Sequence, residues 1–337
     1  MRASHRPLAW VWTVALCALS VVAAGCYYSG CPPGGGQLQI YVTDQGNDRV
    51  VRMDAMNGSN WTTFGSAGSG TGQFDGPAGM DRSRGPGIVV ADALNGRIVS
   101  MSTDMIGGYW FDHGAPGTGI DQFNGPVGVS IGHSALLPYF VADSGNDRIV
   151  RMDDGSGKNW TAFGSLGSGI DQFDGPVAVY ENPAGKIFVV DAGNSRIVQM
   201  DDLSGTNWVT FGTLGSGSGQ FDHPVGAYID AAGRIYIADA GNGRIVRIDD
   251  ISGTNWTTFG TFGPGAGQFN HPTSLVVDED QQYGDGRIYV VDQGNNRVIR
   301  IDDMTGAHWA AFGTRGSGRL QFLLPYAISL GRTVVPC

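Results

Sequence analysis

The stretch Ile40-Tyr-Val-Thr-Asp44-Gln-Gly-Asn47-Asp-Arg49-Val-Val-Arg-Met occurs six times in this chain with small changes. Its aspartate returns at Asp92, Asp143, Asp191, Asp239 and Asp292, and three of the five intervals are 48 residues long. A repeat of this period indicates stacked units that cannot bury their apolar faces alone. It therefore predicts one closed object made of six copies, rather than the two domains that a length of 337 residues suggests.

Each copy divides into four short runs that are rich in β-branched and aromatic residues. In the fourth copy these runs are 176–180, 186–190, 196–200 and 207–211, and Gly, Asn, Asp or Pro residues separate them. This pattern is typical of short strands joined by tight turns, and no capped run with a period of 3.6 predicts a helix. Four-stranded antiparallel sheets repeated radially make a β-propeller, so we expect an all-β, six-bladed propeller over residues 37–337.

The two ends of the chain indicate how the ring closes. The first copy begins with its second strand, and the chain ends with an extra first strand that starts at Pro325. We expect this last strand to lie innermost in the first blade, which removes the free sheet edges. The closure also predicts a disulfide between Cys31 and Cys337, worth roughly 4–5 kcal/mol in the chain-entropy model. The alternative is two free thiols in flexible tails.

The N-terminus has the composition of a secretory signal. Arg2 and Arg6 precede an apolar segment over residues 8–24, and small residues follow before Cys26. The sequence Ala24-Gly25-Cys26 resembles a bacterial lipobox, which implies that residues 1–25 are a lipoprotein signal peptide and that Cys26 is lipidated. Residues 26–36 would then be a tether. An ordinary cleaved signal and an uncleaved anchor remain alternatives.

The charge of the chain excludes one class of partner. The formal net charge is −10, and Lys occurs only at two positions and Glu only at two. An acidic chain without a basic run does not bind a phosphate backbone, so nucleic acid is not an expected partner. An exported, lipid-anchored monomer in the periplasm, in the outer membrane or on the cell surface would meet proteins, peptides or glycans. It would touch the membrane only through its lipid.

The order of strands predicts two different faces. In an antiparallel blade, the loops joining strands one to two and three to four lie at one end, which we call the hairpin face. The turns joining strands two to three lie at the other end with the crossovers between blades, and we call this end the turn face. The repeated motifs then share the turn face, while insertions such as residues 280–286 fall on the hairpin face. The linkers Gly-Ser-x-Gly-Ser-Gly are expected to be flexible turns.

The motif Ile-Tyr-Val-x-Asp-x-Gly-Asn-x-Arg-Ile, preceded by Phe-x-x-Pro-x-Gly, resembles the NHL repeat over about residues 37–331. The resemblance implies a six-bladed propeller used mainly for binding and scaffolding. Two copies depart from the motif: Leu94 stands where the others have Gly, which puts the turn of the second copy in doubt, and Leu323-Leu324-Pro325 replaces Asp-Gly-Pro in the closing copy.

Residues present in every copy are interpreted as structural. The aspartates are expected to accept turn backbone N–H groups, the asparagines to adopt or brace left-handed backbone, and the arginines to pair with acids or stack on neighbouring blades. The remaining members after Asp44, Asn47 and Arg49 are Asp92, Asn95, Arg97, Asp143, Asn146, Arg148, Asp191, Asn194, Arg196, Asp239, Asn242, Arg244, Asp292, Asn295 and Arg297.

Residues that differ between copies are better candidates for function. His223 and His271 precede the first strand of adjacent blades, near one mouth of the central channel, and could ligate a metal. NHL-like lyases of the peptidyl-amidoglycolate kind hold zinc with histidines from such loops. His113 and His133 have no obvious partner in the sequence. No nucleophile motif assigns catalytic residues. The favoured function is an envelope-anchored binding or scaffold propeller without a cofactor. The alternative is a metal-dependent lyase or lactonase-like enzyme at the channel mouth.

Overall fold

The computed structural model describes residues 36–82, 87–105, 108–134, 136–279 and 286–333. These residues belong to the unit Gly34–Cys337, which is compact by its own contacts. The signal segment, Cys26, residues 27–35, both cysteines of the predicted disulfide and most of the insertion at 280–286 lie outside the described residues. Within the described ranges, no helix is long and apolar enough to cross a membrane.

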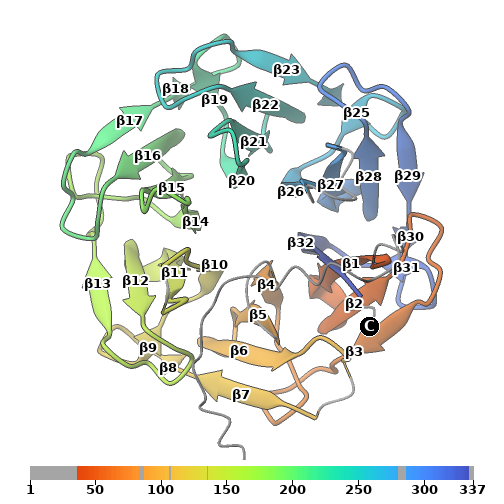
Figure 1. The fold of residues 1–337 in the computed structure, drawn as a ribbon, viewed down its shortest axis with the longest axis horizontal. Helices are drawn as coiled ribbons and strands as arrows, with labels where there is room; N and C mark the ends of the chain where they lie inside the picture. The colour runs from red at the N-terminus through yellow and green to blue at the C-terminus, as the bar shows by residue number, and fades with distance from the viewer. Residues whose placement is uncertain (1–35, 83–86, 106–107, 135, 280–285, 334–337) are drawn as a thin grey trace, which may run out of the picture. The chain divides into compact units, whose positions relative to one another are not determined.

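Six four-stranded antiparallel sheets form the blades, as the repeat predicts (Figure 1). The first three blades contain, from the innermost strand outward, β32 (Pro325–Arg332), β1 (Leu38–Asp44), β2 (Arg49–Met53) and β3 (Thr62–Phe64); β4 (Pro77–Asp81), β5 (Gly87–Asp92), β6 (Arg97–Ser102) and β7 (Trp110–His113); and β10 (Pro126–Ile131), β11 (Tyr139–Asp143), β12 (Arg148–Met152) and β13 (Thr161–Phe163).

The other three blades follow the same order. They contain β14 (Pro176–Glu181), β15 (Ile187–Asp191), β16 (Arg196–Met200) and β17 (Val209–Phe211); β20 (Pro224–Ile229), β21 (Ile235–Asp239), β22 (Arg244–Ile248) and β23 (Thr257–Phe259); and β26 (Pro272–Val277), β27 (Ile288–Asp292), β28 (Arg297–Ile301) and β29 (Ala310–Phe312). The helical residues described are three short 3-10 turns: η1 (Gln45–Asn47), η2 (Ser144–Asn146) and η3 (Gln293–Asn295).

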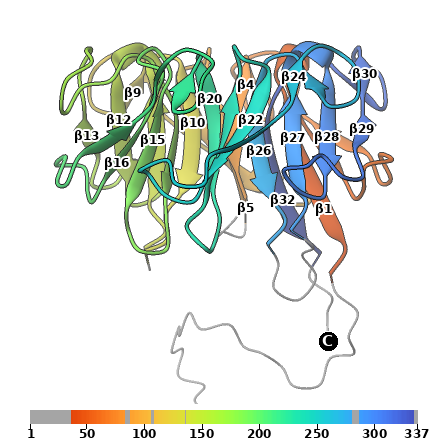
Figure 2. The same ribbon diagram turned by 90° about the horizontal axis from the view of Figure 1, so that it is seen from above.

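The C-terminal strand closes the ring. β32 pairs antiparallel with β1, with Val42 opposite Ile328 and Asp44 opposite Pro325. β32 also contacts β4 on one side and β26 on the other, so the six innermost strands form a closed circle. Figure 2 shows the blades from the side, with the innermost strands running between the turn face and the hairpin face. The predicted closure is therefore confirmed.

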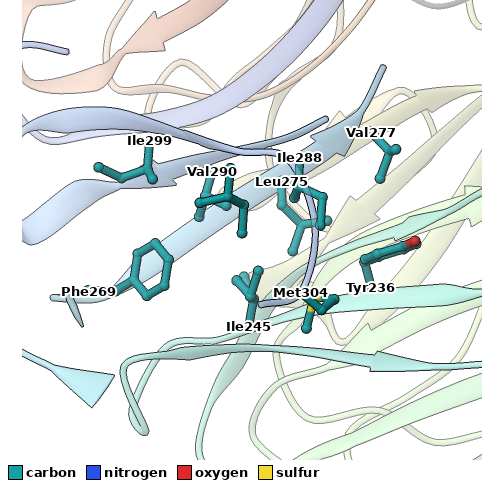
Figure 3. Close-up of a cluster of buried hydrophobic side chains, with 11 residues drawn as sticks. Tyr236, Ile245, Phe269, Leu275, Val277, Ile288, Val290, Ile299 and Met304 are labelled. Atoms are coloured by element: carbon teal, nitrogen blue, oxygen red, sulfur yellow. The ribbon is translucent and has the colours of Figure 1, made fainter. Parts of the chain in front are cut away.

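Apolar clusters between neighbouring blades form the core. Strands such as β27 are buried on both sides because each blade is covered by the next. Figure 3 shows one such cluster, in which Phe269, Val290 and Ile299 pack with Ile245 and Tyr236 of the preceding blade. Each blade thus completes its core only through its neighbour, as expected for stacked units.

The linkers between blades are ordered by short parallel pairs. Four two-residue pairs join β8 (Ala115–Pro116) to β9 (Gln122–Phe123), β18 (Thr213–Leu214) to β19 (Gln220–Phe221), β24 (Thr261–Phe262) to β25 (Gln268–Phe269), and β30 (Thr314–Arg315) to β31 (Gln321–Phe322). The glutamine of each linker also folds back, as when the Gln73 side-chain oxygen accepts the Gly70 N–H at 2.9 Å. The linkers are therefore defined loops rather than featureless turns.

A bulge follows the proline of every innermost strand. In β10, Pro126 pairs with Asp143 and Gly128 pairs with Ala142, which leaves Val127 as the extra residue. The next position is small because the strands approach closely around the ring: a Cβ on Gly128 would lie 2.6 Å from the Val177 carbonyl oxygen. Bulges re-aim side chains and end regular pairing, so this one shapes the turn-side end of the channel.

Candidate functional site

The repeated aspartate ties each blade to the crossover that enters it. In the fifth blade one oxygen of Asp239 accepts the Asp222 backbone N–H at 2.8 Å. The other oxygen accepts the Asn242 amide at 2.8 Å and the Arg244 Nε at 2.7 Å. The backbone N–H comes from the crossover rather than from the turn itself. The asparagine lies inside the turn, and the residue after it adopts the left-handed conformation, as Asp48 does with φ 51°.

The repeated arginine reaches the linker that follows the preceding blade. Arg244 donates to the Ser216 carbonyl at 2.8 Å and to the Gln220 carbonyl at 2.9 Å. Its guanidinium also lies 5.6 Å from the ring centre of Trp256. The other five blades repeat the ion pair and the contact with tryptophan. These side chains therefore join each blade to the linker and crossover before it.

The two copies that depart from the motif keep its geometry. Leu94 N–H donates to the Asp75 carbonyl at 3.0 Å, as Gly241 N–H does to the Asp222 carbonyl at 2.8 Å. Leu94 can do this because its side chain is 70% exposed. In the closing copy, Leu323 N–H donates to Asp44 at 2.7 Å, where the other copies use the backbone N–H of Asp or Asn. The turn of the second copy therefore retains the crossover bond despite its leucine.

The histidines selected from the sequence lie on the turn face. His223 and His271 adopt φ of 47° and 51°, where three other copies have Gly, and both are exposed. His223 Nδ1 lies 2.6 Å from a carboxylate oxygen of Asp222. Neither histidine lines the central cavity. Over the described ranges, no group of three or more His, Cys, Asp or Glu residues could hold a metal ion.

The other two histidines have contacts that the sequence did not reveal. His113, at the end of β7, lies 3.1 Å from a carboxylate oxygen of Asp121. His133 lies on the hairpin face and lines the cavity. Its ring packs edge-on against Tyr180 at 5.6 Å, and its backbone N–H donates to Glu181.

A cavity of about 520 Å³ runs along the six innermost strands. Its turn-side end is formed by the bulged residues, which are apolar in most blades: Val127, Val177, Val225, Thr273 and Tyr326. Desolvation raises the pKa of Tyr326, so its hydroxyl stays protonated. This end therefore offers a neutral, largely apolar wall.

The hairpin-side end of the cavity has an aromatic wall. The rings of Tyr180 and Tyr228 lie 6.2 Å apart, and His133 extends the row on the other side of Tyr180. The Tyr228 hydroxyl donates to Glu279 at 2.8 Å, and Glu279 also accepts the Ala231 N–H at 2.9 Å. Burial, with the nearby Glu279 carboxylate, raises the pKa of Tyr228. Tyr228 thus stays a neutral donor.

Charged groups complete the same end. Arg332 pairs with Asp278 at 2.8 Å. Arg82, on the neighbouring blade, contacts the Arg332 carbonyl at 3.4 Å and lies 5.4 Å from the Tyr41 ring centre. The Arg82 Nε is buried and has no hydrogen-bond partner among the described residues. Sequence reasoning missed this site. One signal could have found it, since the chain has only two glutamates, Glu181 and Glu279, and both lie here.

The comparisons agree with the architecture. The family model described as NHL repeat matches residues 221–248. No curated protein sequence matches the chain. Among solved structures, one from a nidogen/laminin complex is similar with a TM-score of 0.63 at 16% identity, covering 87% of this chain and 98% of that one. A catalytically inactive histidine variant of virginiamycin B lyase from Staphylococcus aureus, with quinupristin, is similar with a TM-score of 0.54 at 14% identity. This match covers 81% of this chain and 80% of that one.

A streptogramin B lyase structure gives a TM-score of 0.56 at 13% identity, covering 89% of this chain and 88% of that one. At these identities the likeness concerns the fold, which hosts both binding proteins and enzymes and does not by itself assign a function. The matched repeat, the five further copies of its motif and the closed ring of six sheets agree with one another. The chain is a six-bladed β-propeller that contains an NHL repeat at residues 221–248.

Proposed function

We propose that this chain is an exported binding propeller whose ligand or partner engages the hairpin face around the mouth of the cavity. The observation that carries the proposal is the loss of sixfold symmetry at that mouth. The fifth residue of each innermost strand is of four different types among the six blades, whereas the turn residues repeat. The six residues are Asp81, Ser130, Tyr180, Tyr228, Val276 and Ser329.

Binding fits this surface better than catalysis because its acids are already engaged. Glu279 accepts bonds from Tyr228 and Ala231, and Asp278 pairs with Arg332. A group held in this way orients a ligand well but is a poor proton carrier, because releasing it costs its internal bonds. The solved nidogen/laminin complex is consistent with a propeller of this fold taking part in protein binding.

Export and anchoring are part of the same proposal. In this proposal the chain is cleaved before Cys26, Cys26 is lipidated, and Cys31 forms a disulfide with Cys337. The ring would then lie at a bacterial envelope, and nucleic acid would not be a partner. Mass spectrometry of the membrane fraction should find Cys26 as a diacylglyceryl N-terminus, and non-reducing peptide mapping should find Cys31 linked to Cys337. A soluble product that begins elsewhere would remove the anchor from the proposal.

The binding face is tested by photo-crosslinking in intact cells. A photoreactive amino acid at Ala184 or Ala232, which are exposed on the hairpin face, should form covalent adducts with the bound partner. The matched positions are Leu166 and Leu214, which are exposed on the turn face and should form none. Adducts only from the turn-face positions would contradict the proposal.

A metal-dependent lyase or lactonase-like activity is the second candidate. It is favoured by His133, which brings an imidazole into the cavity beside Tyr180. Metal analysis of the purified protein tests it, together with the melting curve before and after addition of zinc. Bound zinc that is lost in a His133→Ala variant would favour this candidate over the first.

A further inference from the structure

The hairpin-side end of the cavity has two unlike walls. The innermost strands follow one another around the ring in the order β32, β4, β10, β14, β20 and β26. Arg82 and Arg332 come from the ends of β4 and β32, while His133, Tyr180 and Tyr228 come from the next three blades. In a ring of six, the blades of Tyr180 and Tyr228 stand opposite the first two, while the blade of His133 adjoins the second. The two arginines therefore lie across the cavity from the two tyrosines.

The two arginines of the lining differ in their partners. Arg332 is neutralised by Asp278, and Asp230 pairs with Arg234. Asp81 accepts the Ile131 N–H at 2.8 Å, and Glu279 is held by Tyr228 and Ala231. Among the described residues, Arg82 has no carboxylate partner, and its buried Nε makes no hydrogen bond. A guanidinium that lines a cavity without a carboxylate partner can take one from a ligand.

The kind of anion that would complete it follows from the surroundings. A guanidinium presents its donors as a planar fork, which matches the two oxygens of a carboxylate. The lining also carries four carboxylates, Asp81, Asp230, Asp278 and Glu279, so a singly charged group meets less repulsion there than a doubly charged phosphate. The aromatic wall favours a ligand ring at 4.5–7 Å, the usual distance between packed aromatic rings. The volume of about 520 Å³ admits a small molecule or one end of a chain.

We propose that the cavity binds a small aromatic carboxylate, with Arg82 holding the carboxylate and Tyr180 and Tyr228 packing against the ring. This inference rests on the proposed binding role of the hairpin face and names the chemistry of its ligand. Two sources share this chemistry: a free aromatic acid, and a peptide whose C-terminal residue is aromatic. Capture of a terminal carboxylate is a known mode of peptide recognition.

The test compares probes that differ only in charge. Phenylacetate and its neutral counterpart phenylacetamide are titrated into the full mature chain by calorimetry and by ligand-observed NMR. Phenylacetate should bind at least tenfold more tightly than phenylacetamide, because only the acid completes the Arg82 pair. Equal affinity of the two probes, or no binding of either, would overturn the inference.

Variants assign the effect to the two walls. Arg82→Gln should lower the affinity for phenylacetate at least tenfold and leave the affinity for phenylacetamide unchanged. The control is Arg315→Gln, at an exposed arginine of β30 on the turn face, which should change neither affinity. Tyr180→Leu should weaken both probes. Melting curves of each variant confirm that it is folded. Unchanged phenylacetate binding in a folded Arg82→Gln variant would overturn the inference.

A third set of probes separates the sources. The tripeptide Ala-Ala-Phe is compared with its C-terminal amide. Tighter binding of the free-acid tripeptide than of phenylacetate favours a peptide end, and the reverse favours a free acid; both outcomes support the carboxylate site. If phenylacetate does not bind but the photo-crosslinking positions on the hairpin face still form adducts in cells, the proposed ligand chemistry is wrong and the binding role stands. If phenylacetate binds but the adducts come from the turn face, the partner surface is wrong and the cavity site stands.

Discussion

The turn face and the hairpin face lie at opposite ends of the same strands, four in each of the six blades, yet they differ in how closely the six copies agree. On the turn face each blade places the same aspartate, asparagine and arginine in the same contacts, as Asp239, Asn242 and Arg244 do. On the hairpin face the copies diverge, and the cavity mouth carries an arginine in one blade and a tyrosine in another, such as Arg82 and Tyr228. In a repeat protein, contacts that recur join the units, whereas departures are free to serve a ligand.

A matched pair of phenylalanines on one linker tests this difference most strongly. Phe262 and Phe269 lie opposite each other in the β24–β25 pair, but Phe269 is fully buried and recurs in every copy, while Phe262 is 61% exposed and does not. Phe269→Ala should lower the free energy of unfolding by about 3–5 kcal/mol, because it opens a cavity beside Trp309, 5.4 Å away. Phe262→Ala should change the free energy of unfolding by no more than about 0.5 kcal/mol.

Urea denaturation followed by tryptophan fluorescence measures both variants. The order of the two losses is the decisive result. A Phe262→Ala loss as large as that of Phe269→Ala would break the link between recurrence in the repeat and structural necessity.

A second pair compares the two faces directly. Asp239→Asn keeps the shape of the side chain but replaces one accepting oxygen with an amide nitrogen. The Asn242 amide and the Arg244 Nε then lose their acceptor, so we expect the free energy of unfolding to fall by about 1.5–3 kcal/mol. Tyr228→Phe on the hairpin face removes one hydroxyl bond to Glu279, with an expected loss of about 0.5–1.5 kcal/mol. Both are measured by urea denaturation at pH 7.

The same two variants should rank in the opposite order in their effect on the affinity for phenylacetate. Asp239→Asn should leave the affinity for phenylacetate unchanged in the folded protein, whereas Tyr228→Phe lies in the cavity wall and should alter it. A turn-face variant that lowers the affinity for phenylacetate without unfolding the chain would show that the two faces are energetically coupled.

The fold was predictable because its signal is repeated. Six copies of the motif fixed the strands, and the orphan strand after Pro325 fixed the closure with β1. Single-residue features were harder. The crossover bond of Asp239 to the Asp222 N–H joins segments 17 residues apart, and nothing in local turn chemistry points to it. Leu94 kept the turn because its side chain faces solvent, which the sequence does not state.

The site was less predictable than the fold. His223 and His271 were selected because they differ between copies, but they lie on the turn face and do not line the cavity. The cavity mouth instead depends on residues several positions after the proline, such as Arg82 and Glu279, which converge only once the ring is closed. Convergence of six strand ends is a property of the ring and has no signature in any one copy.

The smallest expected effect is a difference in the sign of pH dependence between the faces. On the turn face, burial raises the pKa of Asp239 above its ordinary value of 3.8, against the opposing hydrogen bonds from the Asp222 N–H, Asn242 and Arg244. On the hairpin face, hydrogen bonds from Ser252 lower the pKa of the exposed Asp250. The four other turn-face aspartates with raised pKa values are Asp44, Asp92, Asp191 and Asp292.

The signs follow from which state holds the proton. Between pH 3.8 and its raised value, folded Asp239 keeps a proton that the unfolded chain releases, so the free energy of unfolding falls as the pH rises through this window. For Asp250 the unfolded chain takes the proton first, so its contribution is present above pH 3.8 and is lost as the pH falls through the lowered value. Carbon-13 NMR titration of the aspartate carboxyls measures both, with Asp250→Asn as the assignment control. If Asp239 loses its proton at a lower pH than Asp250, the buried ion pair outweighs desolvation, and the turn-face carboxylates stabilise the fold as charges rather than tolerate burial.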